Sequence, residues 1–360
     1  MTRTVGIEEE YLLVQGTSPF LAAVGEQVVA VAIENGEGQF EHELKQEQAE
    51  IGTAPHRDIR ALAEELRARR TALARAADSL GVRLLASGTS PLDEQTSTTI
   101  DRRYERMSDV YGRLAKMQLT CGLHVHVAIG SQAEGVAVLD RIRGWLPVVA
   151  ALSSNSPFFA GQETEYASYR SVLWGQWPTA GATDPFGTVE AYEQARADLI
   201  TAGAALDEGM IYFDARLSAR YPTVEVRVCD VCADVADAPV LAALIRALVS
   251  TAATQAAAGA PVPPIRGELM RAAKWRAARF GIEGELVDPI ERRLLPAGEI
   301  IDGMLEAVAP ALRETGDEAF VRDGLERIRD QGTGARLQRE AYAAHGITGV
   351  VDAIAERTVG

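Results

Sequence analysis

The chain has 360 residues, of which 47% are hydrophobic and 24% charged, and its net charge is −15. This composition is typical of a globular protein, and the acidic surface argues against sequence-independent nucleic-acid binding, which needs basic patches to neutralise phosphates. No apolar run reaches the ~20 residues of a membrane span, and Thr2 and Arg3 lead directly into a strand rather than a signal peptide, so we expect a cytoplasmic protein with no membrane segment.

The first predicted strand, residues 5–13, carries paired carboxylates. Glu8 and Glu10 share one face, whereas Glu9 is the charged exception on the otherwise apolar opposite face. Two carboxylates about 6–7 Å apart repel each other unless cations lie between them, and carboxylate oxygens are natural ligands of Mg²⁺ or Mn²⁺. A solvated strand face is the alternative interpretation.

The next segment, residues 40–53, predicts a long polar strand or a strand pair, and its carboxylates leave open which of Glu43, Glu47 and Glu50 faces a site. A helix then follows from Asp58, its N-cap, to Leu80, with Gly81 at the expected position just beyond it. Its arginines are interpreted as a solvated face: Arg67, Arg69 and Arg70.

The second informative strand covers residues 119–129. His124 and His126 share one face of an otherwise apolar strand, and Gly122 precedes them on the same face. A glycine there leaves room for close approach of a ligand. Two histidines together predict a metal or phosphate partner about as strongly as a structural role.

Residues 135–156 predict a helix, kinked at Pro147. The segment from 158 to 187 is then rich in aromatic residues, serine and glycine, and a loop of this length inside a domain is usually functional, for example as a lid. Arg170 is its candidate anion-binding residue, with an ordinary surface arginine as the alternative.

Residues 211–217 and 223–230 predict two more alternating strands. Their polar faces carry Tyr212, Asp214 and Arg216 on the first strand and Glu225 and Arg227 on the second.

Three cysteines, Cys121, Cys229 and Cys232, are too few for a disulfide framework, in agreement with a reducing compartment. Cys229 and Cys232 have the C-x-x-C spacing, but no second pair completes a zinc site. Small buried side chains are therefore favoured over zinc or redox chemistry.

The C-terminal part is predicted to be mainly helical. An alanine- and leucine-rich helix covers residues 238–259, and a basic helix covers 265–281 with Lys274 and Arg279. No repeat or low-complexity linker divides the chain, so we expect one domain over residues 1–360.

The predicted strands share one design, with an aliphatic face for helices to cover and a face of carboxylates, imidazoles and guanidiniums. Such a polar face is costly to bury unless it lines a polar cavity. Carboxylates with histidine suit Mg²⁺ ions and arginines suit phosphate oxygens, a combination typical of phosphoryl transfer. The chain has no Walker A loop and no G-x-G-x-x-G after a strand, which excludes P-loop and Rossmann enzymes.

In this order, the E-x-E, G-x-H-x-H and E-x-R strands resemble the glutamine synthetase fold and its glutamate–cysteine ligase relatives. The resemblance is closer still to the small bacterial carboxylate–amine ligases known as type 2 glutamate–cysteine ligases (the YbdK-like group). Seven segments carry it, at residues 5–10, 43–51, 122–127, 166–170, 177–181, 223–228 and 275–281.

The resemblance implies an α+β fold in which a curved, mainly antiparallel sheet forms a cup with helices packed outside. It implies a substrate carboxylate that attacks the γ-phosphate of ATP, and an amine that displaces phosphate from the acyl phosphate to give an amide. Two or three Mg²⁺ ions, or Mn²⁺, would assist. The implied metal ligands are Glu8, Glu10, Glu50, His124 and Glu225, with His126 beside them. The implied catalytic residues are Glu225, Arg227 and Arg170, and the implied nucleotide contacts are Arg227, Lys274 and Arg279.

Small-molecule substrates are expected, with glutamate and cysteine, giving γ-glutamylcysteine, as the pair that the family name suggests. The acceptor pocket is not specified by any motif. Two alternatives are a phosphotransferase that uses the same cup without ligation and a non-catalytic relative that binds nucleotide or metal. A homodimer is the default expectation for assembly.

Overall fold

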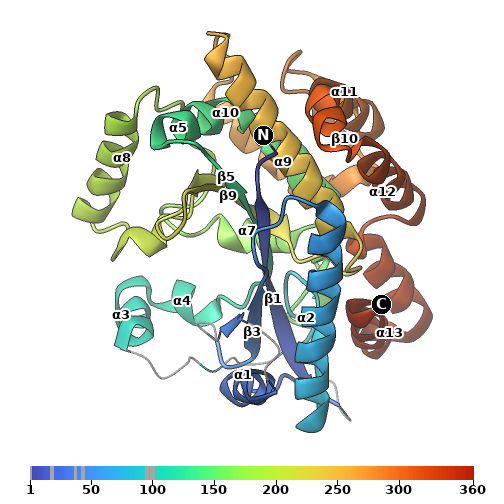
Figure 1. Cartoon of the computed structure of the whole chain (residues 1–360). Coiled ribbons are helices and arrows are strands. Elements are labelled where there is room, and N and C mark those ends of the chain that lie inside the picture. The colour runs from blue at the N-terminus through green and yellow to red at the C-terminus, as the bar shows by residue number, and fades with distance from the viewer. Residues whose placement is uncertain (1, 17–19, 36–38, 42–44, 94–96, 98–101) are drawn as a thin grey trace.

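The computed structural model describes residues 2–16, 20–35, 39–41, 45–93, 97 and 102–360 (Figure 1). Its centre is a seven-stranded sheet in the order β2-β3-β1-β5-β9-β8, with β4 paired to β1 off this path. Neighbouring strands are antiparallel throughout. The strands are β1 (Val5–Gln15), β2 (Gln39–Glu41), β3 (Gln48–Gly52), β4 (Val82–Leu85), β5 (Gly122–Ala128), β8 (Ala215–Leu217) and β9 (Thr223–Asp230).

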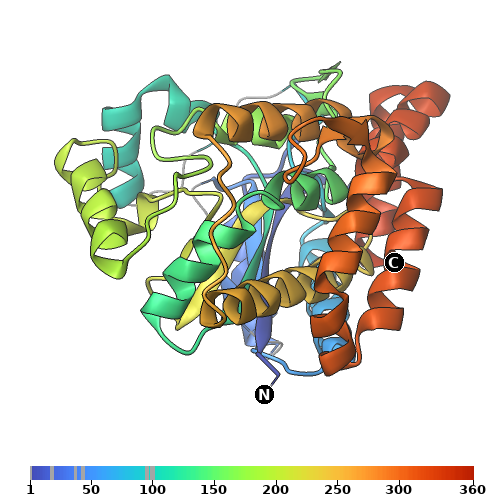
Figure 2. The same ribbon diagram turned by 90° about the horizontal axis from the view of Figure 1, so that it is seen from above.

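Helices cover the aliphatic face of this sheet. Those that lie on this side or behind it are α2 (Ile59–Ser79), α9 (Asp237–Ala257), α11 (Ala297–Thr315), α12 (Glu318–Gln331) and α13 (Gly334–Val359) (Figures 1 and 2). α2 and α9 contact β1, and α13 contacts β4. The predicted α+β architecture, an antiparallel sheet with helices outside, is confirmed.

Helix α9 is long and apolar enough to cross a membrane, although no membrane segment was expected from the sequence. However, 67% of its most apolar window is buried inside the protein. It packs on β1, β5, α5 and α11. Burial among these elements explains its apolar composition as that of a core helix.

The other face of the sheet opens towards shorter elements. They include α3 (Arg102–Tyr111), α4 (Arg113–Met117), α7 (Tyr169–Trp174), α8 (Val189–Thr201) and the 3₁₀ turn η1 (Glu208–Met210). In Figure 1, α3, α4 and α8 lie to the left of the sheet and α2 to its right, so the polar strand face lies on the left-hand side.

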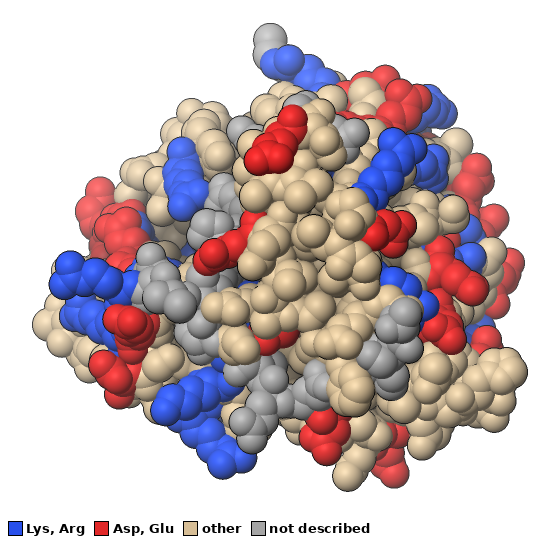
Figure 3. Space-filling view, turned by 90° about the horizontal axis from the view of Figure 1, so that it is seen from below, with Lys and Arg blue, Asp and Glu red and all other residues tan. Residues whose placement is uncertain are grey.

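The remaining elements complete the fold. They are α1 (Gly25–Glu34), α5 (Gln132–Ile142), α6 (Leu146–Leu152), α10 (Gly267–Phe280), the hairpin strands β6 (Phe158–Phe159), β7 (Gln162–Glu163), β10 (Glu285–Val287) and β11 (Leu294–Pro296), and the 3₁₀ turn η2 (Gly281–Glu283). Among them, α6 is fully buried and packs on β9 and α10. The face shown in Figure 3 has a largely uncharged centre with acidic and basic side chains interspersed around it.

Two sequence-based expectations need correction. Residues 135–156 form two helices, α5 and α6, rather than one kinked helix, because Pro147 starts a new helix in its first turn, where its missing N–H is tolerated. Of the two alternatives for residues 40–53, the strand pair is confirmed, because β2 and β3 are antiparallel neighbours, and part of the segment between them lies outside the described residues. Only Ala215–Leu217 of the 211–217 segment pairs as a strand.

The helix predicted from Asp58 is confirmed. Asp58 accepts a hydrogen bond from the Arg60 amide, and Gly81 has a φ of +72° just beyond the C-cap. The interpretation of Arg70 as solvated is wrong, because this residue is 0% exposed. Helical periodicity places Arg70 on the buried side of α2, where it forms an ion pair with Glu9 of β1.

Candidate active site

Polar side chains form a continuous row across five neighbouring strands. The register of the sheet pairs Glu10 with Glu50 and Glu8 with His124. It then pairs His126 with Glu225, and Glu225 with Arg216. Directly paired residues of an antiparallel sheet project from the same face, so residues far apart in the sequence meet on one surface.

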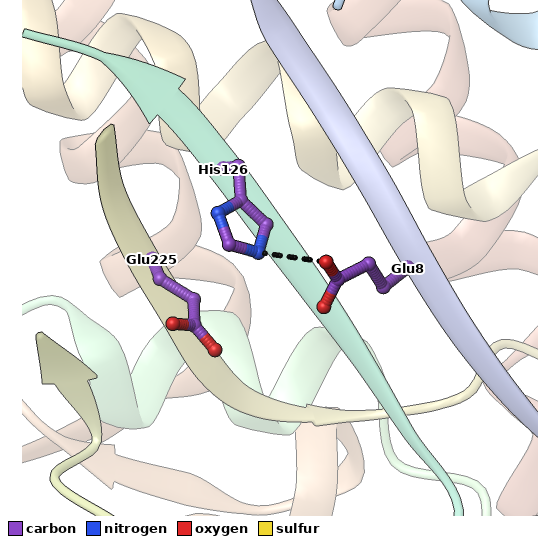
Figure 4. Close-up of side chains that lie close together, drawn as sticks. All are labelled: Glu8, His126 and Glu225. Carbon is purple, nitrogen blue, oxygen red and sulfur yellow. Dashed lines mark ion pairs between the residues drawn. The ribbon is translucent and has the colours of Figure 1, made fainter. Parts of the chain in front are cut away.

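The tightest group in this row contains Glu8, His126 and Glu225, whose ligand-type atoms all lie within 4.8 Å of one another. Figure 4 shows the three side chains pointing towards one another from β1, β5 and β9. His126 Nε2 lies 3.3 Å from Glu8 Oε1, while His126 Nδ1 lies 3.0 Å from Thr223 Oγ1. The hydroxyl fixes the ring so that Nε2 faces the carboxylates.

Two arginines hold Glu225. Arg216 Nε lies 2.7 Å and its Nη2 3.1 Å from the carboxylate oxygens, which is a bidentate pairing. Arg227 Nη1 donates a short hydrogen bond to Glu225 Oε1. Burial opposes ionisation here, but Arg227 and Arg216 hold the pKa of Glu225 well below its usual range.

His124 completes the centre of the row. Its Nδ1 lies 3.5 Å from Glu8 Oε2 and its Nε2 3.9 Å from Glu10 Oε1. Burial and the positive charge of Arg227 lower the pKa of His124 to about 4, so its imidazole is neutral at pH 7. Burial opposes ionisation of Glu8, but the two neighbouring imidazoles keep its pKa well below the usual range.

This donor set fits a divalent cation. The Nε2 atoms of His124 and His126 are buried, and within the described part of the chain they lie 3.9 Å from a carboxylate oxygen of Glu10 and 3.3 Å from one of Glu8, respectively, but form no hydrogen bond. A buried polar nitrogen without a hydrogen bond is unfavourable, and coordination to a metal ion would remove this cost. A neutral imidazole is a common metal ligand. Ionised carboxylates beside the neutral imidazole of His124 suit Mg²⁺ or Mn²⁺ with additional oxygen ligands.

The row forms the floor of a cavity of about 680 Å³. Aromatic side chains contribute to its walls, and Arg227 lies over the rings of Trp174 and Tyr212 at 5.7 and 6.0 Å. The sequence-predicted residues that line it are Glu8, Glu10, Glu50, His124, His126, Glu225 and Arg227.

The structure separates the three candidate carboxylates of the 43–50 segment. Glu50 lines the cavity, whereas Glu47 is buried elsewhere and accepts a hydrogen bond from the Ser97 amide at 2.8 Å. Glu43 lies outside the described residues. Glu10 accepts a 2.6 Å hydrogen bond from the Gly122 amide, which orients its carboxylate beside β5.

Three predicted basic residues lie outside the cavity lining. Arg170 is buried, and its Nη2 lies 3.4 Å from the Arg227 carbonyl oxygen. Lys274 pairs with Asp214, and Arg279 pairs with Glu165 on a different surface.

Arg170 fills the space that Gly122 leaves. A Cβ at Gly122 would lie 2.3 Å from Arg170 Nη2, so the glycine accommodates this guanidinium rather than a ligand. Arg170 is also 5.5 Å from the Trp174 ring centroid, which places it behind the cavity wall.

Sequence reasoning did not single out Arg216 as a site residue, although it placed this residue on a polar strand face. The alternation of Arg216 with Tyr212 and Asp214 indicated that its side chain shares their strand face. Only the register of β8 on β9 identifies Glu225 as its partner. Arg103 and Asp207 at the cavity were also missed, because they lie on a helix and a turn without a motif.

Comparison with known proteins agrees with this architecture. The profile of glutamate–cysteine ligase family 2 matches residues 4–356. A Frankia alni protein provisionally named glutamate–cysteine ligase 2-2 is 47% identical over 371 residues, covering 99% of this chain and 97% of the relative. A Streptomyces coelicolor protein provisionally named glutamate–cysteine ligase 2 is 46% identical over 359 residues, covering 99% of each chain.

Among solved structures, the Francisella tularensis glutamate–cysteine ligase in complex with AMP has a similar fold. The TM-score is 0.71 at 14% sequence identity, and the superposition covers 100% of this chain and 88% of the other. At this level of identity the likeness establishes the shared fold.

Proposed function

This chain belongs to glutamate–cysteine ligase family 2 and is an ATP-dependent carboxylate–amine ligase, and we propose that it forms its amide through an acyl phosphate. The observation that supports this mechanism is the row of Glu8, His126, Glu225 and Arg227 on the floor of one cavity. It combines a cation site with a guanidinium, the two means of neutralising a phosphoryl group in transfer.

We propose that Glu8, Glu10, Glu50, His124, His126 and Glu225 hold two or three Mg²⁺ or Mn²⁺ ions. Bound metal would supply charge neutralisation for ATP and the carboxylate substrate, two anions that otherwise repel. The ionised state of Glu8 and Glu225 and the neutral state of His124 at pH 7 favour this role.

Arg227 is the proposed contact for the transferring phosphoryl group, since its guanidinium lines the cavity. Its pairing with Glu225 and its position over Trp174 and Tyr212 restrict its orientation before substrate arrives. Arg170 then acts through Arg227, because it donates to the Arg227 carbonyl and fills the space beside Gly122.

Lys274 and Arg279 remain proposed nucleotide contacts from the resemblance alone. Each is held by a carboxylate outside the cavity lining, Lys274 by Asp214 and Arg279 by Glu165. Lys274 has an indirect connection to the site, because the Asp214 carbonyl accepts the Arg227 amide at 3.0 Å.

The proposed substrate pair to test first is glutamate and cysteine, because the relatives carry that name. The experiment measures Mg²⁺-dependent ADP release with a matrix of amino acids and amines, and identifies products by mass. One pair that gives both ADP and an amide supports the proposal. A phosphorylated small molecule without an amide would indicate phosphotransfer, and ATP binding without ADP release would indicate a non-catalytic relative.

Glu225→Gln is the matching variant, and we expect it to lower kcat by about 10²–10³-fold, as for loss of one preorganised electrostatic group. Glu306→Gln, an exposed residue of α11 on the far side of the sheet, is the control and should leave turnover unchanged. Full turnover by Glu225→Gln would contradict the assigned site.

Two broader proposals rest on the sequence. All three cysteines are free and buried, in keeping with a cytoplasmic, reducing location. A homodimer is proposed only as the default assembly.

A further inference from the structure

Arg143, at the C-terminal end of α5, is buried without hydrogen-bond partners. It is 3% exposed, and its Nε, Nη1 and Nη2 atoms all lack a partner within the described residues. A guanidinium has five N–H donors, and leaving them unmet inside a protein is strongly unfavourable. Burial also lowers the pKa of Arg143, against the opposing effect of Asp184 and Asp140.

The two nearby carboxylates do not meet this need. Asp140 accepts the Phe186 and Gly187 amides, each at 2.8 Å, and so is already engaged in holding the loop before α8. Asp184 Oδ1 lies 3.8 Å from Arg143 Nη2, too far for a hydrogen bond. The Asp184 side chain is 83% exposed, so water competes for its charge and its side chain is free to rotate outwards.

The first turn of α10 also lies close to Asp184. A Cβ at Gly267 would lie 3.3 Å from Asp184 Oδ1 and 3.8 Å from Arg271 Nη1. The helix has 14 residues and no side-chain cap at its N-terminus. Its first amides therefore add positive potential at the place where the Asp184 carboxylate sits.

We propose that Arg143, Arg271 and the N-terminal turn of α10 form a binding site for a small tetrahedral oxyanion of the phosphate class, which takes the position of the Asp184 carboxylate. An oxyanion with several acceptor oxygens can bind a guanidinium and helix amides at the same time. The Asp184 carboxylate does not form both sets of hydrogen bonds. None of Arg143, Asp184, Gly267 and Arg271 lines the 680 Å³ cavity, so this site is distinct from the proposed active site.

The test is a titration with inorganic phosphate at constant ionic strength, which is set with chloride. Calorimetry measures the binding, and thermal unfolding measures the stabilisation that the binding produces. It is carried out with Arg227→Gln protein, so that phosphate binding in the active-site cavity is weakened. Sulfate and acetate are titrated in parallel. Binding of sulfate together with phosphate supports a tetrahedral oxyanion, whereas equal binding of acetate would overturn the phosphate class.

Exposed residues provide the variants that discriminate. Asp184→Asn removes the competing carboxylate and should tighten phosphate binding, whereas Arg271→Gln should weaken it by about tenfold, as expected for one charge-assisted contact. Glu268→Gln, on the same helix turn but paired with Arg266, is the control for a general change of surface charge. Phosphate affinity that is unchanged in both Asp184→Asn and Arg271→Gln would overturn the proposal.

Arg143→Met gives a second, independent signature. Removing an unsatisfied buried charge should raise the unfolding temperature in phosphate-free buffer and abolish the phosphate-dependent increase. A phosphate-dependent increase equal to that of the Arg227→Gln parent would overturn the proposal. If this variant does not fold, the two exposed-residue variants decide the question by themselves.

Discussion

Glu9 and Arg70 form a fully buried, bidentate ion pair on the face of β1 opposite to Glu8 and Glu10. Arg70 Nη2 lies 2.6 Å from Glu9 Oε1 and Arg70 Nε 2.8 Å from Glu9 Oε2. Arg70 also donates to the carbonyl oxygens of Cys232, Ala233 and Thr358 at 3.0–3.4 Å. This one guanidinium therefore joins α2, β1, the segment after β9 and the C-terminal end of α13 behind the active-site floor.

Breaking this pair should be strongly destabilising. We expect Arg70→Met to lower the free energy of unfolding by about 3–5 kcal/mol, because it leaves the Glu9 carboxylate buried without its counter-charge. The double variant Glu9→Leu/Arg70→Met should recover most of that loss, since no uncompensated charge remains. Urea unfolding measures both, with the exposed Arg67→Met on the same helix as control. An unfolding midpoint for Arg70→Met equal to that of the control would contradict the structural role of the pair.

Local patterns in the sequence predicted which side chains share a strand face. Alternation placed Glu8 with Glu10, His124 with His126 and Glu225 with Arg227, and all six line the cavity. Such alternation is a property of each strand alone and does not depend on its neighbours.

The remaining features depend on long-range pairing. Helical periodicity places Arg70 on the buried side of α2, but this arginine was interpreted as solvated because the sequence of α2 does not reveal its carboxylate partner, Glu9 on β1. The space at Gly122 was expected to receive a ligand, but it is filled by Arg170 from a helix 48 positions further along the sequence. Arg216 could be assigned to Glu225 only from the register of β8 and β9.

Gly122→Ala should disturb the site, whereas Gly6→Ala should not. The added Cβ at Gly122 would lie 2.3 Å from Arg170 Nη2, inside contact distance, and Arg170 is buried with little room to move. At Gly6, on the adjacent strand, the nearest atoms would be 3.8 Å away. We expect a loss of about 1–3 kcal/mol in unfolding free energy for Gly122→Ala, with reduced turnover, and little change for Gly6→Ala.

Thermal unfolding and steady-state ADP release measure both glycine variants. Equal behaviour of the two would show that Arg170 is not held in the space beside Gly122.

The C-x-x-C cysteines should be unreactive thiols in the native protein. Burial raises the pKa of Cys229 from its ordinary value of 9.0 to about 12, and it also raises the pKa of Cys232. A thiol titration reagent at pH 8 should modify both at least about a hundredfold more slowly than in denaturant, because the thiolate is the reactive form. Rapid native modification, or zinc that copurifies and is lost in Cys229→Ala, would contradict this expectation.

The raised pKa of Cys229 also makes the stability of the protein depend on pH. The folded state holds the Cys229 proton more tightly than the unfolded chain, so its contribution to stability is complete below pH 9 and is lost as the pH rises from 9 to about 12. The decline in unfolding free energy over this range should be shallower in Cys229→Ala than in the wild type. An identical slope in both proteins would show that Cys229 is not the group concerned.

Glu8→Gln should weaken binding of a divalent cation more than any change outside the floor of the cavity. Mn²⁺ is the probe, and its free concentration is followed by electron paramagnetic resonance in the absence of nucleotide. Loss of the Glu8 charge removes one of the three groups that converge within 4.8 Å. We therefore expect Mn²⁺ affinity to fall at least as much as the roughly tenfold change seen when an outer hydrogen-bond partner of a metal ligand is lost.

Thermal unfolding supplies a second measurement of Mn²⁺ binding. Mn²⁺ should raise the unfolding temperature of the wild type, with a stabilisation that grows as RT ln(1 + c/Kd), where c is the free Mn²⁺ concentration, and a chelator should reverse the increase. Glu8→Gln should show a smaller rise, because the cation binds its folded state less tightly. Glu134→Gln, which replaces a carboxylate paired with Arg3 away from the cavity, is the matched control and should respond like the wild type. An unchanged Mn²⁺ response in Glu8→Gln would show that the cation is held elsewhere, since a carboxylate at the centre of a metal site cannot be neutralised without loss of affinity.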